Sequence, residues 1–392
     1  MTIPTDRVGV VDQPVTGSRP TPPATRVERR ADRDRSKRKR RWWIGAVVAV
    51  VVGVVAATAV VVGVRSKAAP PAAPPKPLPL PPAASASAPA TIFSQGELVS
   101  DPTVMVDGGH NYLYGTGGAK YVRPHVPVRV MNGTTTLTQA TDAMPTLPTW
   151  SWGWIWAPDV AKAGNHYVMW FTTQDIHRTN PDGLDSQCIG NATSDSPLGP
   201  FTPGPAPVIC QRWGDIDPRT FTDADGSHWL LWKSDTNADH TQVLPTTIWS
   251  QRLADNGTTL LGKRIQIAVA TQPWEQALIE APDMVLSGGK YYLFFSGASS
   301  AVSWAGIGYE TCKGVRGPCT DTRTAPFLAS NAQGNGPSEE SLFTQNGVTW
   351  LMYTPTAIYQ PFQYPYLAIA RVAFGPTGPY LAAFDGKNPG HG

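Results

Sequence analysis

Four carboxylate residues lie at nearly the same distance ahead of aromatic segments of this sequence. Asp101, Glu280 and Glu339 each lie eleven residues before the first aromatic residue of such a segment, and Asp217 lies twelve residues before another. If folding brings these side chains together, they repel one another and lose solvation. Such an arrangement costs stability, so it indicates a functional site. Carboxyl groups in different environments can hold different protonation states, as acid–base chemistry requires.

The aromatic segments are the second halves of predicted β-hairpins. Each follows a turn rich in Gly, Asn, Asp or Ser, residue types that suit tight turns, and no long stretch between them keeps a helical period. The spacings between their first aromatic residues are 55, 62, 62 and 59 residues. The five segments begin at Tyr112, Tyr167, Trp229, Tyr291 and Trp350.

A near-constant period of this size, built only from strands, is typical of a β-propeller with one four-stranded blade per repeat. We therefore predict an all-β fold, a five-bladed β-propeller over residues 92–392. A β-sandwich is the alternative, but it gives no reason for the period. The first strand of each blade lines the central channel, so the carboxylates would converge there. For Asp101 or Asp217 alone, an ordinary Asp-Pro turn is an equally good interpretation.

Five short motifs, in order and at blade spacing, resemble those of glycoside hydrolase family 43. They are Asp101-Pro102-Thr103-Val104, Trp156-Ala157-Pro158-Asp159-Val160, Ile189-Gly190 to Gly199-Pro200-Phe201, Ile216-Asp217-Pro218 and Glu280-Ala281-Pro282. The resemblance covers about residues 92–380. It implies a five-bladed propeller that hydrolyses arabinan-type or xylan-type glycans with inversion of configuration.

The resemblance also implies a role for three carboxylates. Asp101 matches the general base that activates water, and Glu280 matches the general acid that protonates the departing glycosidic oxygen. Asp217 matches a third carboxylate that orients the acid and keeps its pKa raised. Inversion needs acid and base about 6.5–9.5 Å apart, a separation that residues on different blades can provide.

Further residues are predicted to contact substrate. Trp156, Trp213 and Trp274 could stack on sugar rings, with packing between blades as the alternative. Ser338 and Glu339 lie where many relatives have a Gly-Pro-Gly-His run, whose His helps to hold a central metal ion or water. We therefore predict no required cofactor and no His-linked calcium site, although Glu339 could itself serve a cation.

The first 91 residues differ in composition from the rest. Residues 1–41 hold twelve Lys or Arg against five Asp or Glu, and residues 42–64 carry no charge. A helix over these 23 residues would be about 34 Å long, enough for roughly 30 Å of bilayer hydrocarbon. We predict a disordered cytoplasmic arm (1–41), a transmembrane signal-anchor helix (42–64) and a Pro/Ala-rich stalk (65–91). A cleaved signal peptide is the alternative.

All four cysteines lie in the predicted propeller, and four cysteines allow three pairings. We predict local disulfides, Cys188 with Cys210 and Cys312 with Cys319, because each pair lies within one repeat. An exported domain permits disulfides, and neither spacing resembles that of a zinc ribbon.

The sequence as a whole predicts a monomeric, single-pass cell-membrane protein that presents an inverting glycosidase outside the cell, with wall polysaccharide as a candidate substrate. A catalytically inactive carbohydrate-binding propeller is the main alternative, and a transglycosylase or fructan-acting relative is a third interpretation. Residues 92–392 hold seventeen basic against twenty-four acidic residues. This acidic balance argues against nucleic acid as a partner.

Overall fold

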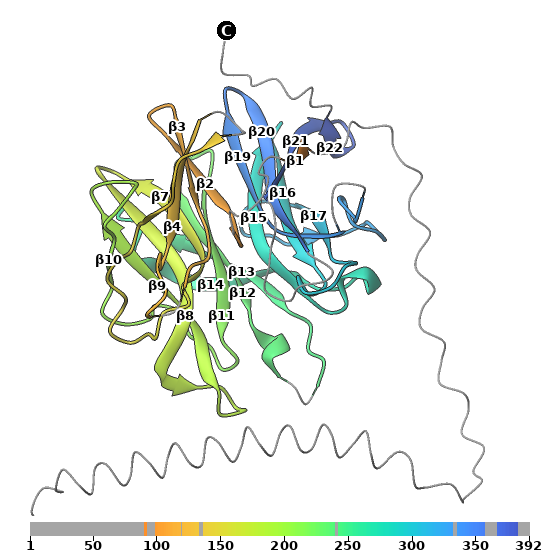
Figure 1. The fold of residues 1–392 in the computed structure, drawn as a ribbon. Coiled ribbons are helices and arrows are strands. Elements are labelled where there is room, and N and C mark those ends of the chain that lie inside the picture. Colours follow the sequence, from red (N-terminus) through yellow and green to blue (C-terminus); the bar gives the residue numbers. More distant parts are fainter. Residues whose placement is uncertain are drawn as a thin grey trace, which may run out of the picture. The chain divides into compact units, whose positions relative to one another are not determined.

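The computed structural model describes residues 90–91 and 99–382, apart from 119, 133–135, 240–241, 332–334 and 357–366. The regular structure of these residues is β-strand, with two short 3-10 helices, η1 (Thr236–Ala238) and η2 (Pro273–Glu275). The strands form five antiparallel sheets around a common centre (Figure 1). The predicted all-β, five-bladed propeller is confirmed.

The first four blades follow one another along the chain. Blade one contains β2 (Thr103–Asp107), β3 (His110–Tyr114), β4 (Pro127–Asn132), β5 (Thr136–Leu137) and β6 (Thr141–Asp142). Blade two contains β7 (Trp156–Ala163), β8 (His166–Thr179), β9 (Asp185–Ser194) and β10 (Thr202–Pro203). Blade three contains β11 (Asp215–Thr222), β12 (His228–Ser234), β13 (Thr247–Leu253) and β14 (Leu260–Val269). Blade four contains β15 (Ile279–Ser287), β16 (Lys290–Gly297), β17 (Gly306–Cys312) and β18 (Cys319–Thr320).

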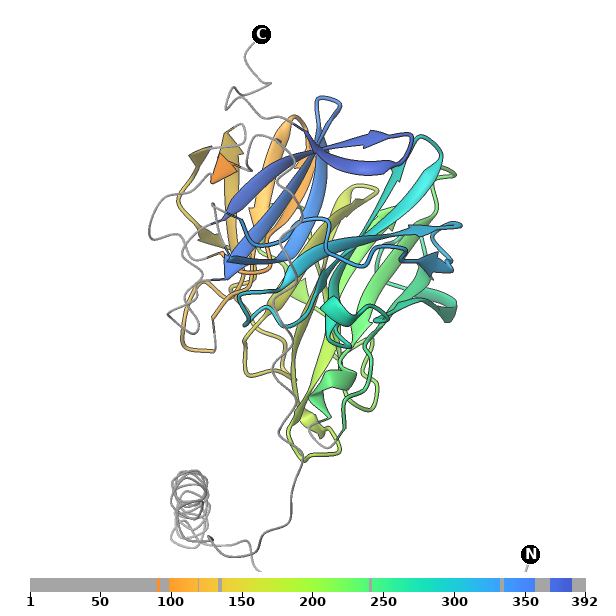
Figure 2. The same ribbon diagram turned by 90° about the vertical axis from the view of Figure 1, so that its right-hand side faces the viewer.

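Blade five joins strands from both ends of the propeller. It contains β19 (Asn335–Gln345), β20 (Val348–Thr356), β21 (Ala368–Gly375) and β22 (Gly378–Ala382), and β1 (Ala90–Thr91) pairs antiparallel with β21. The blue strands of this blade lie beside the orange strands of blade one (Figure 2). The ring is therefore closed within one sheet by a strand that precedes blade one.

Each predicted aromatic segment forms the second strand of a blade, which confirms the five hairpins. Side chains alternate between the two faces of a strand, and here both faces are covered by neighbouring blades. In β16, Leu293 and Phe295 pack toward blade three, whereas Tyr292 and Phe294 pack toward blade five. Burial on both faces explains why these strands are apolar at successive positions instead of alternating with polar residues.

The N-terminal predictions concern residues that the structure does not describe. The arm, the anchor helix at 42–64 and most of the stalk lie outside the described residues. Within the described part of the chain, helices are too short and too polar to span a bilayer. Membrane anchoring therefore stays a prediction.

Candidate active site

Five residues with left-handed backbone conformation, one from each blade, surround the centre of the propeller. Each lies near the start of the innermost strand of its blade. Their φ angles are 50° at Asp101, 42° at Ala157, 55° at Asp217, 51° at Ala281 and 54° at Glu339. A residue with a side chain adopts this conformation at a cost of roughly 1–3 kcal/mol, and such strain is concentrated at functional sites.

All five of these residues line a single small pocket, together with Pro218, Arg219 and Glu340. Asp101, Asp217 and Glu339 bring carboxyl groups to it from blades one, three and five. Glu280 does not itself line the pocket; it immediately precedes Ala281, is only 7% exposed, and lies near enough for its charge to act on Asp217 and Glu339. The structure therefore brings the four carboxylates singled out in the sequence to one place.

Hydroxyl groups hold this ring in position. In three cases, the backbone N–H of a left-handed residue donates to a hydroxyl on the second strand of the preceding blade or just after it. These bonds join Ala157 to Thr116 Oγ1 (3.0 Å), Asp217 to Thr172 Oγ1 (3.1 Å) and Glu339 to Ser296 Oγ (2.8 Å). Because each bond spans two blades, it fixes the strained residues relative to one another.

Asp101 is only partly buried. Thr116 Oγ1 donates a hydrogen bond to Asp101 Oδ2, and the same hydroxyl oxygen accepts the Ala157 N–H. A carboxylate that is held through one oxygen and still reaches the pocket is suited to accept a proton from a bound water molecule.

Asp217 is linked to Glu280 through the backbone of blade four. The Ala281 N–H donates to Asp217 Oδ2 over 3.1 Å, so Asp217 contacts the residue that follows Glu280. Burial raises the pKa of Asp217 to about 7, and the Glu280 charge adds to this rise, while Lys233 opposes it. Lys233 Nζ donates to Glu280 Oε2 over 2.9 Å, and both side chains are buried.

Glu339 lines the pocket with its carboxyl group in a setting that disfavours the anion. Burial raises its pKa well above its usual range, and the charges of Glu280, Asp101 and Asp217 raise it further. Burial and three neighbouring carboxylates thus favour the neutral form of Glu339. Its neighbour Glu340 accepts a hydrogen bond from the Ser296 hydroxyl.

Arg219 connects three other blades at the pocket wall. Its guanidinium lies 3.2 Å from Asp159 Oδ1 in blade two and 3.7 Å from Asp283 Oδ2 in blade four. It also donates to the Glu340 carbonyl of blade five over 3.2 Å. Arg219 is thus a structural hub that closes one side of the site.

The profile of the glycosyl hydrolases family 43 matches residues 95–373 of this sequence. The chain belongs to this family. A stretch of 76 residues is 40% identical to xylosidase/arabinosidase 43A of Humicola insolens, covering 19% of this chain and 20% of that protein. Over 280 residues it is 23% identical to the extracellular endo-α-(1→5)-L-arabinanase 1 of Bacillus subtilis, covering 64% of this chain and 79% of the relative.

Solved family-43 structures share the fold. A thermostable family-43 glycoside hydrolase aligns with a TM-score of 0.67 at 21% identity, covering 77% of this chain and 99% of the other. An endo-arabinase of Bacteroides thetaiotaomicron aligns with a TM-score of 0.58 at 21% identity, covering 76% of this chain and all of the other. Membership in a family of glycosidases favours an enzyme over an inactive carbohydrate-binding propeller.

The tryptophans predicted to bind substrate in this family-43 chain lie in different surroundings. Trp156 and Trp213 are partly exposed. Trp274 is only 8% exposed and stacks on Phe295 in the core between blades three and four. With its ring covered by packing, Trp274 has no face free for a sugar, which contradicts its predicted role. Ser338 is fully buried beside Glu339 and does not line the pocket.

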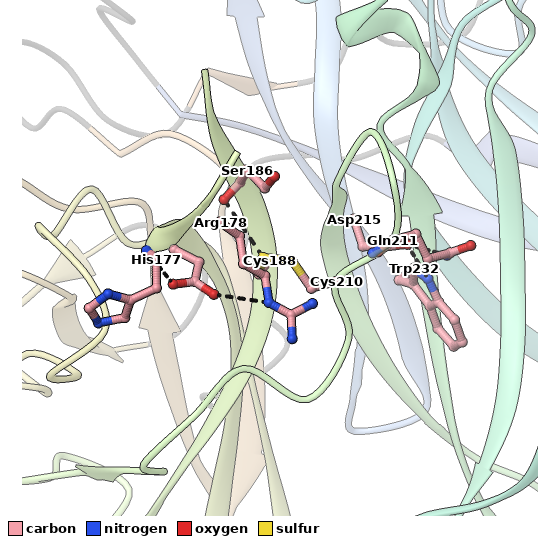
Figure 3. The surroundings of a disulfide bond; sticks show 9 residues. His177, Arg178, Ser186, Cys188, Cys210, Gln211, Asp215 and Trp232 are labelled. Carbon is pink, nitrogen blue, oxygen red and sulfur yellow. Dashed lines mark hydrogen bonds and ion pairs between the residues drawn. A yellow bond between two sulfur atoms is a disulfide. The ribbon is translucent and has the colours of Figure 1, made fainter. Parts of the chain in front are cut away.

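The predicted disulfides Cys188–Cys210 and Cys312–Cys319 are both present. Figure 3 shows the first, which joins β9 to the segment before β11. In that segment, Gln211 donates to Asp215 through its backbone N–H and its side chain, and Trp232 Nε1 donates to Asp215 Oδ1 over 3.0 Å. The disulfide thus anchors the chain that leads into Asp217. Asp175 lies close to both sulfurs, but disulfide-bonded cysteines are not available as metal-binding thiolates.

Sequence reasoning missed Lys233, Thr116 and Arg219. None of the three belongs to a quoted motif, although Arg219 directly follows Ile216-Asp217-Pro218. The signal for Lys233 was a charged residue near the end of an otherwise apolar strand, Trp229-Leu230-Leu231-Trp232. A buried Lys at such a place calls for a carboxylate partner.

Proposed function

We propose that this protein is an inverting glycosidase that cleaves pentose-containing glycans of the arabinan or xylan type. The observation that carries the proposal is the set of carboxylates from different blades around one strained central pocket. Family membership supports hydrolysis of glycosidic bonds, and relatives named as an arabinanase and a xylosidase/arabinosidase support pentose substrates.

In the proposed reaction, Asp101 accepts a proton from a water molecule that attacks the anomeric carbon. Glu280 gives its proton to the departing glycosidic oxygen, so one C–O bond forms while the other breaks. Asp217 orients this step through the backbone of Ala281. Glu339 lines the pocket and can hydrogen-bond to the sugar, and Trp156 and Trp213 can offer ring faces to it.

We also propose that residues 42–64 anchor the protein in the cell membrane with the propeller outside. The basic cluster before this apolar stretch supports that orientation. The two disulfides support an oxidising location for the propeller. Protease digestion of intact cells tests the proposal, because cleavage of the propeller without lysis is expected and full protection would contradict it.

The activity is tested with the full-length protein on aryl arabinofuranosides and xylosides, then on arabinan and wall arabinogalactan. We expect the wild type to release sugar, and NMR should show that the product first formed has the anomeric configuration opposite to that of the substrate. Glu280→Gln and Asp101→Asn should each lose at least 10²-fold in kcat/KM. Asp225→Asn, on a surface turn, is the matched control and should keep full activity. Binding of glycans by a wild type that releases no sugar would instead show a binding propeller.

A further inference from the structure

Lys233 interrupts a pattern that the other four blades share. In each blade, the innermost strand has a residue directly before its left-handed residue. One residue at the end of the second strand, or just after that strand, lies opposite this preceding residue. Thr172, Ser296 and Thr354 occupy this place in blades two, four and five, and in blade one the Thr116 N–H bonds to the Ser100 carbonyl. Blade three has Lys233 there, opposite Ile216.

The missing hydroxyl changes how blade four is held. In three other places a hydroxyl accepts the N–H of the next blade's left-handed residue. At blade four that N–H belongs to Ala281, and it donates to Asp217 Oδ2 instead. Lys233 is thereby freed to extend its side chain to Glu280, the residue just before Ala281.

The ammonium group of Lys233 is almost completely enclosed. Lys233 is 1% exposed, and its Nζ lies 2.9 Å from Glu280 Oε2 and 3.3 Å from Asp235 Oδ1. Burial by itself would lower the pKa of this amine, but Glu280, Asp235 and Asp217 together raise it, so it is charged. The titratable groups that line the pocket are Asp101 of blade one, Asp217 and Arg219 of blade three, and Glu339 and Glu340 of blade five.

We propose that Lys233 is a positioning residue for the acid step, holding the Glu280 carboxyl group by one oxygen and stabilising the negative charge that it acquires. This inference rests on the proposed function. When Glu280 gives its proton to the glycosidic oxygen, the carboxylate that remains forms beside a fixed ammonium group. A preorganised charge at this distance stabilises the developing anion without reorganisation.

The test compares Lys233→Thr, which restores the hydroxyl found in the other blades, with the wild type on aryl glycosides of graded leaving-group ability. Protonation matters for poor leaving groups and hardly at all for dinitrophenolate. We expect kcat/KM to fall about tenfold or more for poor leaving groups and to change less than threefold for dinitrophenyl glycosides. Loss of a positive neighbour raises the pKa of a carboxyl group. The fall of kcat/KM at high pH, the basic limb of its pH profile, should therefore lie about one pH unit higher in Lys233→Thr than in the wild type.

Two further variants keep the test independent of folding. Lys233→Arg keeps the charge and should retain the wild-type basic limb. Asp235→Asn leaves Lys233 in place and removes a nearby negative charge, so it should move the basic limb to lower pH. An equal loss on all leaving groups with no movement of the basic limb in any variant would overturn the proposal. Failure of the proposed function looks different, because the wild type itself would then be inactive or Glu280→Gln would remain active.

Discussion

Removal of the Arg219 guanidinium should strongly destabilise the propeller. In Arg219→Met, Asp159 and Asp283 lose their cation at 3.2 Å and 3.7 Å, in a site where the Arg side chain is only 11% exposed. Breaking a buried ion pair from one side costs about 3–5 kcal/mol. Asp159 still accepts the Thr220 N–H over 2.8 Å, and Asp283 still accepts the Leu342 N–H over 2.7 Å. We therefore expect the low end, about 3 kcal/mol, or a fall in Tm of roughly 6–12 °C.

The same variant should show a defined dependence on pH. Burial raises the pKa of Asp283 to about 6, although Arg219 opposes this rise. Its pKa is about 3.9 in the unfolded chain, so the folded state binds more protons between these values, and stability falls as pH rises through them. Without Arg219 the folded pKa rises further. The deficit of Arg219→Met should therefore be smaller at pH 5 than at pH 7.5.

Thermal unfolding of the full-length protein at the two pH values measures this difference. Arg178→Met is the matched control, because Arg178 forms an ion pair with Asp175 at 3.5 Å while its side chain is 58% exposed. Such a surface pair contributes about 0–1 kcal/mol. The reasoning is refuted if Arg219→Met loses less than the control or if its deficit grows as the pH falls.

Three further predictions concern stability. Replacing both Cys188 and Cys210 by Ser opens a loop with a sequence separation of 22 and should cost about 3 kcal/mol, visible as a lower urea midpoint; an unchanged midpoint would contradict this. Asp217→Asn should be inactive, and its Tm relative to that of the wild type should rise between pH 5 and pH 8. Burial raises the pKa of Asp217 to about 7, so only the wild type must bury an anion at the higher pH. A Tm difference that does not change with pH would contradict this. Trp170→Ala should cost about 3–5 kcal/mol, since Trp170 is fully buried, and a loss below 1 kcal/mol in the same urea titration would contradict that packing.

The repeat could be predicted because both faces of each second strand are buried, which makes the aromatic segments easy to recognise. Counting back from those segments was accurate to one residue. It gave Trp156, Pro218 and Glu280, whereas the left-handed residues are Ala157, Asp217 and Ala281. The shift arises because the first aromatic residue is the second residue of β8, β12 and β16 but the third of β3 and β20. In addition, the turn of blade three, residues 223–227, is longer than the two-residue turns of the other blades. Residue spacing alone does not reveal where each strand begins.

The fate of Trp274 was harder to foresee. A Trp suits a sugar-binding site and a blade interface equally well, and composition does not separate the two. The distinguishing signal lies in its neighbours, because a Cβ on Gly297 would come within 2.2 Å of the Trp274 ring and one on Gly308 within 2.9 Å. These two glycines of apolar strands leave the space that the buried Trp274 ring fills.

Closure of the ring by β1 has a consequence for how the molecule can come apart. A linear array of repeats has free end units, which can fray one at a time while the remainder stays folded. Here blade five contains both β1 and the C-terminal strands, so each blade has two neighbours. Separation of blade five from blade one must break both the packing between them and the short β1–β21 pairing. That pairing joins Ala90 to Ile369 and Thr91 to Ala368. Only two residues of β1 thus make this pairing. The first local opening detected under denaturant should therefore be faster hydrogen exchange of the β21 amides that face them.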